Sequence, residues 1–453
     1  MNAPADAPAT SPRRPNILFI MADDHAARAI SCYGHGINHT PHIDRIAQEG
    51  VRLDHCYVSN SICTPSRAAI LTGTYNHVNG VMTLDDGIDN RLPNVAKHLQ
   101  AAGYQTAIVG KWHLGEGPAH RPTGFDHWSV VPGQGDYFDP VFHEAGGVVQ
   151  RPGYVTDVIT DQCLQWLDAR DASRPFFLMC HHKAPHRSWE NHPKHDSAYT
   201  DDVQVPASFD DDYRHRAAAA AAAKMRIADD LTYLDLKRYL RTIASIDESV
   251  GRLLEWLDAQ GLAQDTLVVY TSDQGFFLGE HGWYDKRFMY EQSFQMPFVA
   301  RWPREIAPGG VRTDIASNVD FAPTFLDLAG TVVPSYMQGR SLRGLLRGDL
   351  PADWPQVAYH RYWMHQDEYH NAYAHYGIRD HRYKLIYWYN QGLGARGSQP
   401  GGQPPEWELF DCEKDPLELF NCWAEPGYQE VVRRMTALLE QKMLEIGDTP
   451  AHR

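Results

Sequence analysis

The sequence predicts an α/β fold: a large mixed, mostly parallel sheet sandwiched by helices, followed by a smaller C-terminal antiparallel sheet with a helix. Two observations predict it. Short apolar runs of the kind buried in parallel sheets alternate with helical stretches over most of the chain. After about Pro355 the pattern changes to alternating strands rich in aromatic residues. The 453 residues, 43% hydrophobic and 22% charged, exclude disorder, collagen and coiled coil as the main architecture.

The expected elements of the larger part follow in chain order. Buried strands are expected at residues 16–21, 105–109, 175–180, 266–271 and 297–300. Helices are expected at residues 46–51, 65–73, 94–102, 157–169 and 241–260. Glycines at 73, 103 and 261 end three of these helices, as glycine often does. Strands that alternate with helices predict βαβ units and a parallel sheet covered on both faces.

The last hundred residues are expected to form a subdomain of their own. Residues 357–364, 376–389 and 406–411 predict antiparallel strands, and residues 428–446 predict a closing helix. A loop rich in glycine and proline, residues 391–405, separates the last two strands, and the seven alanines at 217–223 are expected to be helical. The predicted organisation is a flexible tail over 1–13, a catalytic domain over 14–354 and a C-terminal subdomain over 355–453.

The net charge, the lack of long apolar runs and the cysteine content restrict which partners and which compartment we expect. There are 42 Lys and Arg against 57 Asp and Glu, a net charge of −15, so neither nucleic acid nor an anionic membrane is an expected partner. No run of 18 apolar residues occurs, and the N-terminus lacks the long apolar stretch of a secretory signal. Seven scattered cysteines favour a reducing compartment, so we expect a cytoplasmic protein; a homo-oligomer remains open.

Polar clusters follow directly after four of the expected strands. They are residues 22–25 (ADDH), 110–113 (GKWH), 181–186 (HHKAPH) and 272–275 (SDQG). Any one of them alone is more typical of a turn, a helix cap or a structural histidine. Because ligands of open α/β sheets bind at the carboxyl ends of strands, four such clusters together predict a functional site.

Oxygen donors dominate two of these clusters. Asp23, Asp24, Asp273 and Gln274 offer carboxylate and amide oxygens, which suit a hard divalent cation such as Ca²⁺ or Mg²⁺. A pair of helix N-caps is the competing interpretation. It explains each pair separately, but not why carboxylates end two strands of one sheet.

A fifth cluster carries a resemblance to a known family. Residues 63–67 read Cys-x-Pro-x-Arg and are followed by AAILTG. Alone this pentapeptide is only moderately specific, since a buried cysteine before a helix proline is also acceptable. Together with NILFIMADD, GKWHLG, KAPH, TSDQGFFLGEHGWYDKRFMYE and WELFDCEKDPLEL, in this order, it resembles the type I sulfatases of the alkaline phosphatase superfamily. The stretch GEHGWYDKRFMYE is most similar to bacterial sulfatases like N-acetylglucosamine-6-sulfatase; Gln274 departs from the family, which more often has Asn.

The resemblance implies a modified cysteine and a metal centre. Cys63 would be oxidised to formylglycine by a formylglycine-generating enzyme, and the hydrated aldehyde would be the nucleophile. The implied metal shell, which would hold Ca²⁺ or Mg²⁺, is Asp23, Asp24, Asp273, Gln274 and the modified Cys63. Arg67, one helical turn beyond the cysteine, would hold the hydrated aldehyde.

Further roles are implied for a second ring of residues. Lys111 and Lys286 would bind sulfate oxygens. His113 would take a proton from the hydrate, and His186 with Lys286 would protonate the leaving alcohol. His182 and His281 are expected equally to support these residues or to be structural. One hydroxyl of the hydrate would attack sulfur, and the second would then expel sulfate from the sulfated hemiacetal.

The implied reaction is release of sulfate from a small sulfated carbohydrate or an aryl or alkyl sulfate. Six residues are candidates for the pocket or equally for the core: Trp112, His120, Arg121, Tyr137, Trp283 and Tyr284. Two other functions stay open: a phosphodiesterase or phosphonate monoester hydrolase of the same superfamily, and a non-catalytic anion binder with unoxidised Cys63.

Overall fold

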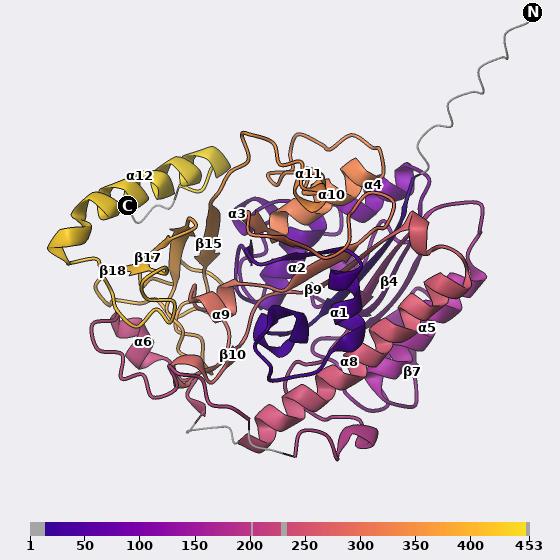
Figure 1. The fold of residues 1–453 in the computed structure, drawn as a ribbon, viewed down its shortest axis with the longest axis horizontal. Helices are drawn as coiled ribbons and strands as arrows, with labels where there is room; N and C mark the ends of the chain where they lie inside the picture. Colours follow the sequence, from indigo (N-terminus) through magenta and orange to yellow (C-terminus); the bar gives the residue numbers. More distant parts are fainter. Residues whose placement is uncertain (1–13, 201–202, 228–232, 450–453) are drawn as a thin grey trace, which may run out of the picture.

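The structure is a computed structural model that describes residues 14–200, 203–227 and 233–449. Its centre is a ten-stranded sheet in the order β13-β2-β12-β9-β1-β8-β4-β5-β6-β7 (Figure 1). The strands are β1 (Asn16–Ala22), β2 (Val51–Leu53), β4 (Gln105–Lys111), β5 (His127–Val131), β6 (Val141–Glu144), β7 (Gly147–Gln150), β8 (Phe176–His181), β9 (Thr266–Ser272), β12 (Phe298–Arg301) and β13 (Gly310–Arg312). The central strands β9, β1, β8, β4 and β5 are parallel, while β12, β6 and β7 pair antiparallel. The predicted mixed, mostly parallel sheet is confirmed.

Helices cover both faces of this sheet. The side chains of a strand point alternately to the two faces, and in the central strands both sets are apolar and must be buried. Leu18 and Ile20 of β1 face one helical layer, and Ile17 and Phe19 face the other. The first layer contains α1 (Pro41–Gln48), α5 (Val155–Ala169) and α8 (Tyr233–Ala259), and the second contains α2 (Cys63–Thr72), α4 (Val95–Ala101) and α10 (Phe321–Leu328) (Figure 1).

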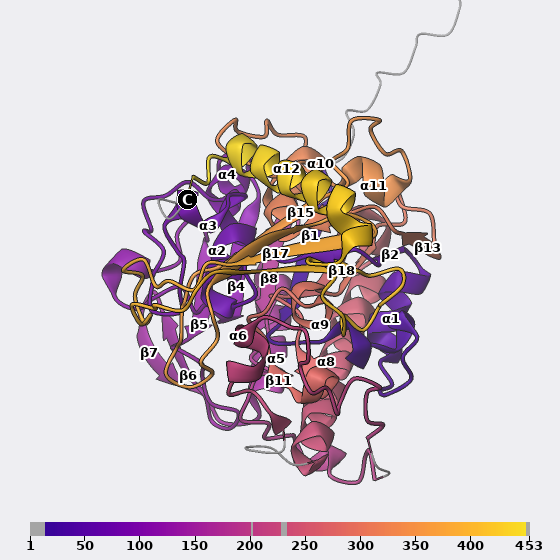
Figure 2. The same ribbon diagram turned by 90° about the vertical axis from the view of Figure 1, so that its left-hand side faces the viewer.

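A second, antiparallel sheet follows residue 355, as predicted, but it has four strands because the predicted segment 376–389 forms two of them. In order, its strands are β15 (Ala358–Tyr362), β16 (His375–Arg379), β17 (Tyr383–Trp388) and β18 (Glu406–Asp411). Helix α12 (Gln429–Ile446) packs Met435 and Leu439 against one face of it (Figure 2). The other face contributes Ile386 and Phe410 to the core shared with α2 and α10, so the two sheets are joined by a continuous apolar interior.

Short elements complete the chain. Two small ladders pair β3 (Cys56–Tyr57) with β14 (Ala316–Ser317) and β10 (Phe277–Leu278) with β11 (Tyr284–Asp285). The short helices are α3 (Asn76–Asn79), α6 (Ala218–Ala222), α9 (Glu291–Phe294) and α11 (Arg343–Arg347). Within the described ranges, no helix combines the length and the apolar character needed to cross a membrane.

One predicted helix is wrong. Residues 46–51 were expected to be helical, but α1 ends at Gln48 and Val51 begins strand β2. The cause is the close approach at Gly50, where a Cβ atom would lie 2.0 Å from the carbonyl oxygen of Ala300 in β12. A glycine at this contact lets the chain leave the helix and enter the sheet at once. The expected tail, residues 1–13, lies outside the described residues.

Candidate active site

The carboxyl ends of β1, β4, β8 and β9 bring the predicted polar clusters to one edge of the sheet. Ala22 and Ser272 are register partners in neighbouring parallel strands, so Asp23 and Asp273 leave the sheet side by side. The backbone N–H of Asp24 donates to Asp273 Oδ1 over 3.1 Å, which ties the two strand ends together. The alignment of parallel strands therefore produces this acidic cluster directly.

Three carboxylates converge at this edge. Oxygen atoms of Asp23, Asp24 and Asp273 lie within 4.8 Å of one another, and all three side chains are buried. Burial, reinforced by the charge of Asp23, raises the pKa of Asp24 to about 6 and that of Asp273 to about 7. Among the described residues, no hydrogen-bond donor reaches Asp23 Oδ1 or Gln274 Oε1. Unpaired buried oxygens are unfavourable, so this donor set fits a hard divalent cation.

Two cations stand on one side of the carboxylates. Lys111, the last residue of β4, bonds through Nζ to Asp23 and to Gln134 Oε1. Arg67 Nε and Nη2 lie 3.0 and 2.9 Å from Asp273 Oδ2. Burial works to raise the pKa of Asp23, but Lys111 and the neighbouring cations outweigh it and hold that pKa well below its ordinary value. Arg67 therefore contacts Asp273, a carboxylate of the predicted metal shell.

Lys286 stands on the other side, after the short strand β11. Its Nζ bonds to Asp24 Oδ1 and lies 3.3 Å from Cys63 Sγ. Burial works to lower the pKa of Lys286, but Asp24 and the other acidic groups around it together outweigh burial and raise that pKa, so the ammonium stays charged. A permanent positive charge therefore lies beside the predicted nucleophile.

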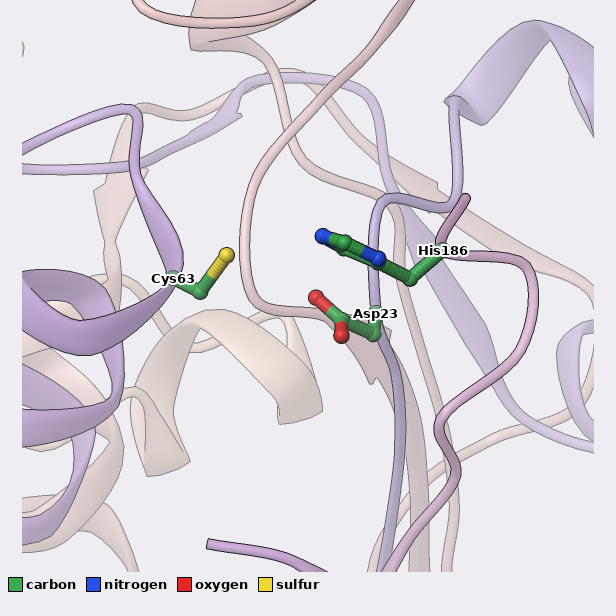
Figure 3. Close-up of side chains that lie close together, drawn as sticks. All are labelled: Asp23, Cys63 and His186. Carbon is green, nitrogen blue, oxygen red and sulfur yellow. The ribbon is translucent and has the colours of Figure 1, made fainter. Parts of the chain in front are cut away.

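Cys63 begins helix α2, with its side chain directed at the acidic cluster. Atoms of Asp23, Cys63 and His186 lie within 4.8 Å of one another, and the three side chains point toward one another (Figure 3). Burial raises the pKa of the Cys63 thiol to about 12. A thiol that stays protonated at neutral pH is a weak nucleophile, so unmodified Cys63 is poorly suited to attack a substrate.

Two histidines complete the ring around Cys63. Burial and the charge of Lys111 lower the pKa of His186 well below its ordinary value, so the ring is neutral. Its Nδ1 lies 2.6 Å from the carbonyl oxygen of Arg187, which requires Nδ1 to be the donor and leaves Nε2 free to accept a proton. Nε2 lies 3.6 Å from Asp24 Oδ2. His113 lies beside the helix start, with Nδ1 3.5 Å from Thr64 Oγ1.

The backbone at these turns is in an uncommon conformation. Asp24, His113, Asp285 and Arg287 have φ of 68°, 52°, 77° and 96°, in the left-handed region that non-glycine residues rarely adopt. Such residues cost roughly 1–3 kcal/mol each and persist only when their surroundings hold them. Four of the 14 non-glycine residues with positive φ in the described part of the chain thus lie at the turns that carry the site.

The structure therefore brings together all ten residues predicted for the site. They are Asp23, Asp24, Cys63, Arg67, Lys111, His113, His186, Asp273, Gln274 and Lys286. Their individual roles remain predictions.

His182 and His281 point elsewhere. His182 Nε2 lies 3.2 Å from Ser249 Oγ of α8, on the far side of the strand from the cluster. His281 Nδ1 lies 2.8 Å from Asp211 Oδ2, inside an aromatic core. Of the two readings, the contacts favour the structural one for both histidines.

The six pocket candidates divide into two groups. Tyr137, Trp283 and Tyr284 are 3% exposed or less and pack in the interior. Trp112, His120 and Arg121 line a cavity of about 600 Å³ next to His113. The second group therefore lines this cavity, and the first group does not.

Sequence reasoning missed a buried ionic network around Lys286. His370 lies 3.2 Å from Asp285 Oδ2 and 2.7 Å from Arg287 Nη2, and Asp367 Oδ1 lies 2.7 Å from its Nδ1. The charged neighbours of Lys286 in Asp-Lys-Arg were a usable signal. His370 had none, because its loop lies 84 residues further along the chain.

Comparisons with known proteins agree with this geometry. A family model described as Sulfatase matches residues 15–331, and one described as N-sulphoglucosamine sulphohydrolase, C-terminal, matches residues 279–445. The chain is 40% identical to N-acetylglucosamine-6-O-sulfatase of Bacteroides thetaiotaomicron, over 96% of the chain and 87% of the relative. It is 29% identical to human N-acetylglucosamine-6-sulfatase, over 76% of the chain and 67% of the relative.

Solved structures extend the similarity. The structure of BT4656 in complex with its substrate D-glucosamine-2-N,6-O-disulfate has a TM-score of 0.91 and 38% identity, covering 97% of this chain and 100% of the other. Ps i-CgsB in complex with k-i-k-neocarrahexaose has a TM-score of 0.75 and 23% identity, covering 96% and 93%, which shows a shared fold.

Proposed function

The chain belongs to the sulfatase family and is a sulfatase, and we propose that it releases sulfate from the 6-O position of a glucosamine unit. The observation that carries the proposal is that side-chain atoms of Cys63, His186 and Asp23 lie within 4.8 Å of one another. Lys286 lies beside Cys63, and buried carboxylates surround both. The choice of a 6-O-sulfated glucosamine rests on the relative at 40% identity and on the substrate of BT4656.

A divalent cation, Ca²⁺ or Mg²⁺, belongs to the proposal. Asp23, Asp24, Asp273 and Gln274 would hold it, and when bound it withdraws charge from a sulfate oxygen as a Lewis acid. The charge balance supports this. When all three buried carboxylates are ionised, as they would be around a bound cation, they balance the three charges of Lys111, Lys286 and Arg67. A divalent cation would leave two positive charges, which a sulfate monoester and an ionised nucleophile would neutralise.

The remaining side chains would orient the ester and move protons. Once a cation occupies the carboxylates, Lys111 and Lys286 are free to turn their ammonium groups to sulfate oxygens. His186 Nε2 carries no proton in the neutral ring, so it would first take one up from solvent when the anionic ester binds and then pass it to the leaving oxygen, while His113 is placed to remove a proton from the nucleophile. Oxidation of Cys63 to formylglycine would supply a hydrated aldehyde with two hydroxyls, one to attack and one to release sulfate.

A sulfate-release screen tests the proposal. The substrates are N-acetylglucosamine-6-sulfate, glucosamine-2-N,6-O-disulfate, glucosamine-2-N-sulfate, nitrophenyl sulfate and a bis-nitrophenyl phosphodiester. We expect release from both 6-O-sulfated sugars and none from the 2-N-sulfate, with Cys63→Ala as the inactive control. Faster cleavage of the phosphodiester, or release from the 2-N position alone, would contradict the proposed function.

Substitution of His186 should affect poor leaving groups most. His186→Ala is expected to lower kcat for a 6-O-sulfated sugar by roughly 10²–10⁴-fold, the usual contribution of a general acid. The loss on nitrophenyl sulfate should be small, because nitrophenolate hardly needs a proton. Equal losses on both substrates would assign His186 to sulfate binding or to structure instead. His195→Ala, at a histidine outside the cluster, is the matched control.

Removal of the Gln274 amide should weaken binding of the cation. Gln274→Leu keeps the volume but deletes the unpartnered Oε1, so Kd for Ca²⁺ should rise about tenfold or more, as for other lost polar support of a metal site. In wild type, Ca²⁺ at a hundredfold excess over Kd should stabilise the fold by about 2.7 kcal/mol, seen as a rise in Tm of chelator-treated protein. Gln274→Leu at the same Ca²⁺ should show a smaller rise, whereas the exposed Gln429→Leu should match wild type. An unchanged rise in Gln274→Leu would remove this residue from the cation shell.

A further inference from the structure

The cavity of about 600 Å³ next to His113 has no part in the chemistry proposed above. Its walls come from residues 84–86, the loop after β4, β5 with the residues that follow it, and the β6–β7 hairpin. The lining used below is Trp112, Trp128, Glu116, Arg121, Asp85 and Asp86. It is thus a formed cavity rather than a shallow patch on the surface.

The cavity and the active-site cluster share a wall. His113 lines the cavity and also lies 3.5 Å from Thr64, the residue after Cys63. Gln134, next to the lining residue Gly133, contacts Lys111 and lies 3.5 Å from His113. A substrate bound at Cys63 would therefore need to extend only past His113 to enter the cavity.

One wall of the cavity is rigid. Trp112 donates its indole N–H to the carbonyl oxygen of His120 over 2.8 Å, and His120 Nδ1 lies 2.7 Å from the carbonyl oxygen of Ile88. Cβ atoms at Gly87 and Gly115 would lie 2.7 and 2.8 Å from the His120 ring, so both positions need glycine for this ring to fit. Trp112 is therefore held in place before any ligand arrives, which lowers the entropy lost on binding.

The chemistry of the lining suits a sugar. Trp112 and the half-buried Trp128 present indole rings, which pack against the C–H faces of pyranoses. Carboxylates accept hydrogen bonds from sugar hydroxyls. This combination of ring faces and acceptors is typical of carbohydrate sites.

The charge of the lining restricts which sugar. Asp85, Asp86 and Glu116 face a single lining arginine, Arg121. The remaining lining carboxylate, that of Glu144, is paired with an arginine outside the lining at 2.6 Å and is thereby neutralised. The net charge of these lining groups is negative, so a uronate or a second sulfate would be repelled, whereas a neutral unit would not.

We propose that this cavity is a subsite for a neutral sugar unit that is glycosidically linked to the sulfated glucosamine, and that it discriminates against acidic units. The inference rests on the proposed function, because it extends the substrate of the same site by one residue.

Three substrates test it: the 6-O-sulfated N-acetylglucosamine alone, the same sugar linked to a neutral hexose, and the same sugar linked to a hexuronate. We expect kcat/KM for the neutral disaccharide to exceed that for the monosaccharide by about fivefold, the effect of one well-made aromatic contact. The hexuronate disaccharide should fall below the monosaccharide. Equal kcat/KM values for all three would overturn the proposal.

Variants locate the effect. Trp128→Ala should bring the neutral disaccharide down to the monosaccharide rate and leave the monosaccharide rate unchanged. Trp423→Ala, at a half-buried tryptophan stacked on Trp407 in another part of the molecule, is the matched control and should keep the fivefold preference. Glu116→Gln should raise kcat/KM for the hexuronate disaccharide selectively. An equal loss on all substrates in Trp128→Ala would make Trp128 a structural residue and contradict the subsite.

A binding measurement separates this inference from the proposed function. The neutral disaccharide without its sulfate is titrated into wild type, Trp128→Ala and Trp423→Ala, and binding is followed by ligand-observed NMR. Contact signals in wild type and Trp423→Ala that are lost in Trp128→Ala would support the subsite even if no sulfated sugar were hydrolysed. Absence of contact in wild type would refute the subsite even if the monosaccharide were hydrolysed.

Discussion

Replacing Asp273 with asparagine should lower kcat/KM for a 6-O-sulfated glucosamine by roughly a thousandfold or more, since a Lewis acid contributes several kcal/mol and about 1.4 kcal/mol is a factor of ten. The substitution removes one charge from the proposed cation shell. It also leaves Arg67 without the carboxylate that it contacts at 3.0 and 2.9 Å, so the metal-free site becomes positive and repels a cation. Asp273→Ala should lose at least as much.

If Asp273 acts by holding the cation, the loss of activity in Asp273→Asn must be accompanied by loss of bound metal. Elemental analysis should find little bound cation in Asp273→Asn, and chelation of wild type should reproduce the defect until Ca²⁺ or Mg²⁺ is restored. Asp320→Asn is the matched control, because Asp320 is also buried but its carboxylate accepts a hydrogen bond from the backbone N–H of Ser317 and not from a group of the cluster. Full activity of a wild-type sample shown to be free of metal would refute the cation.

Cys63→Ser, made in a host that does not oxidise serine at this motif, should perform at most one turnover. The serine hydroxyl would stand beside Lys286 and the carboxylates, so the first transfer of sulfate to it remains possible. Serine has one hydroxyl, however, so no second hydroxyl can expel sulfate by elimination. The variant should therefore retain the sulfate as about 80 Da of added mass, a stable form of the covalent intermediate.

Mass spectrometry of the peptide that contains residue 63 reads this directly. Wild type should turn over many times and carry no such adduct at rest, and Cys63→Ala should show neither turnover nor adduct. Cys56→Ser replaces another fully buried cysteine and should keep wild-type turnover. Sustained turnover by Cys63→Ser near the wild-type rate would exclude the aldehyde hydrate and favour a metal-activated water.

The edge of the sheet was predictable from sequence for a physical reason. Strands β1, β4, β8 and β9 are continuous apolar runs that end in polar residues, and parallel strands place their carboxyl ends together. The grouping of Asp23, Lys111, His186 and Asp273 followed from that alone. The approach of Cys63 to this edge came instead from the resemblance to a family, since nothing in its local sequence states where α2 begins in space.

Other features had no local signal. His181 and His182 are neighbours at the end of β8, and adjacent strand residues point to opposite faces, so only the register decides which one faces helix α8. Strands β5, β6 and β7 are short, and β7 is exposed along its whole length, so they lack the apolar runs that identified the central strands. The cavity that these strands line could consequently not be predicted from the sequence.

Every residue of helix α2 is buried, and Cys63 at its start is 1% exposed. If Cys63 is oxidised as we propose, this burial restricts when the oxidation can occur. An enzyme that modifies Cys63 would have to reach a side chain that the folded protein encloses, at the start of a helix that contacts α3, α4 and α10. We therefore expect the proposed oxidation of Cys63 to come before this part of the chain folds, and a molecule that folds first to keep the thiol. The fraction of active enzyme in a preparation would then depend on the relative rates of folding and modification. Adding the maturation enzyme to the purified, folded protein would not change that fraction.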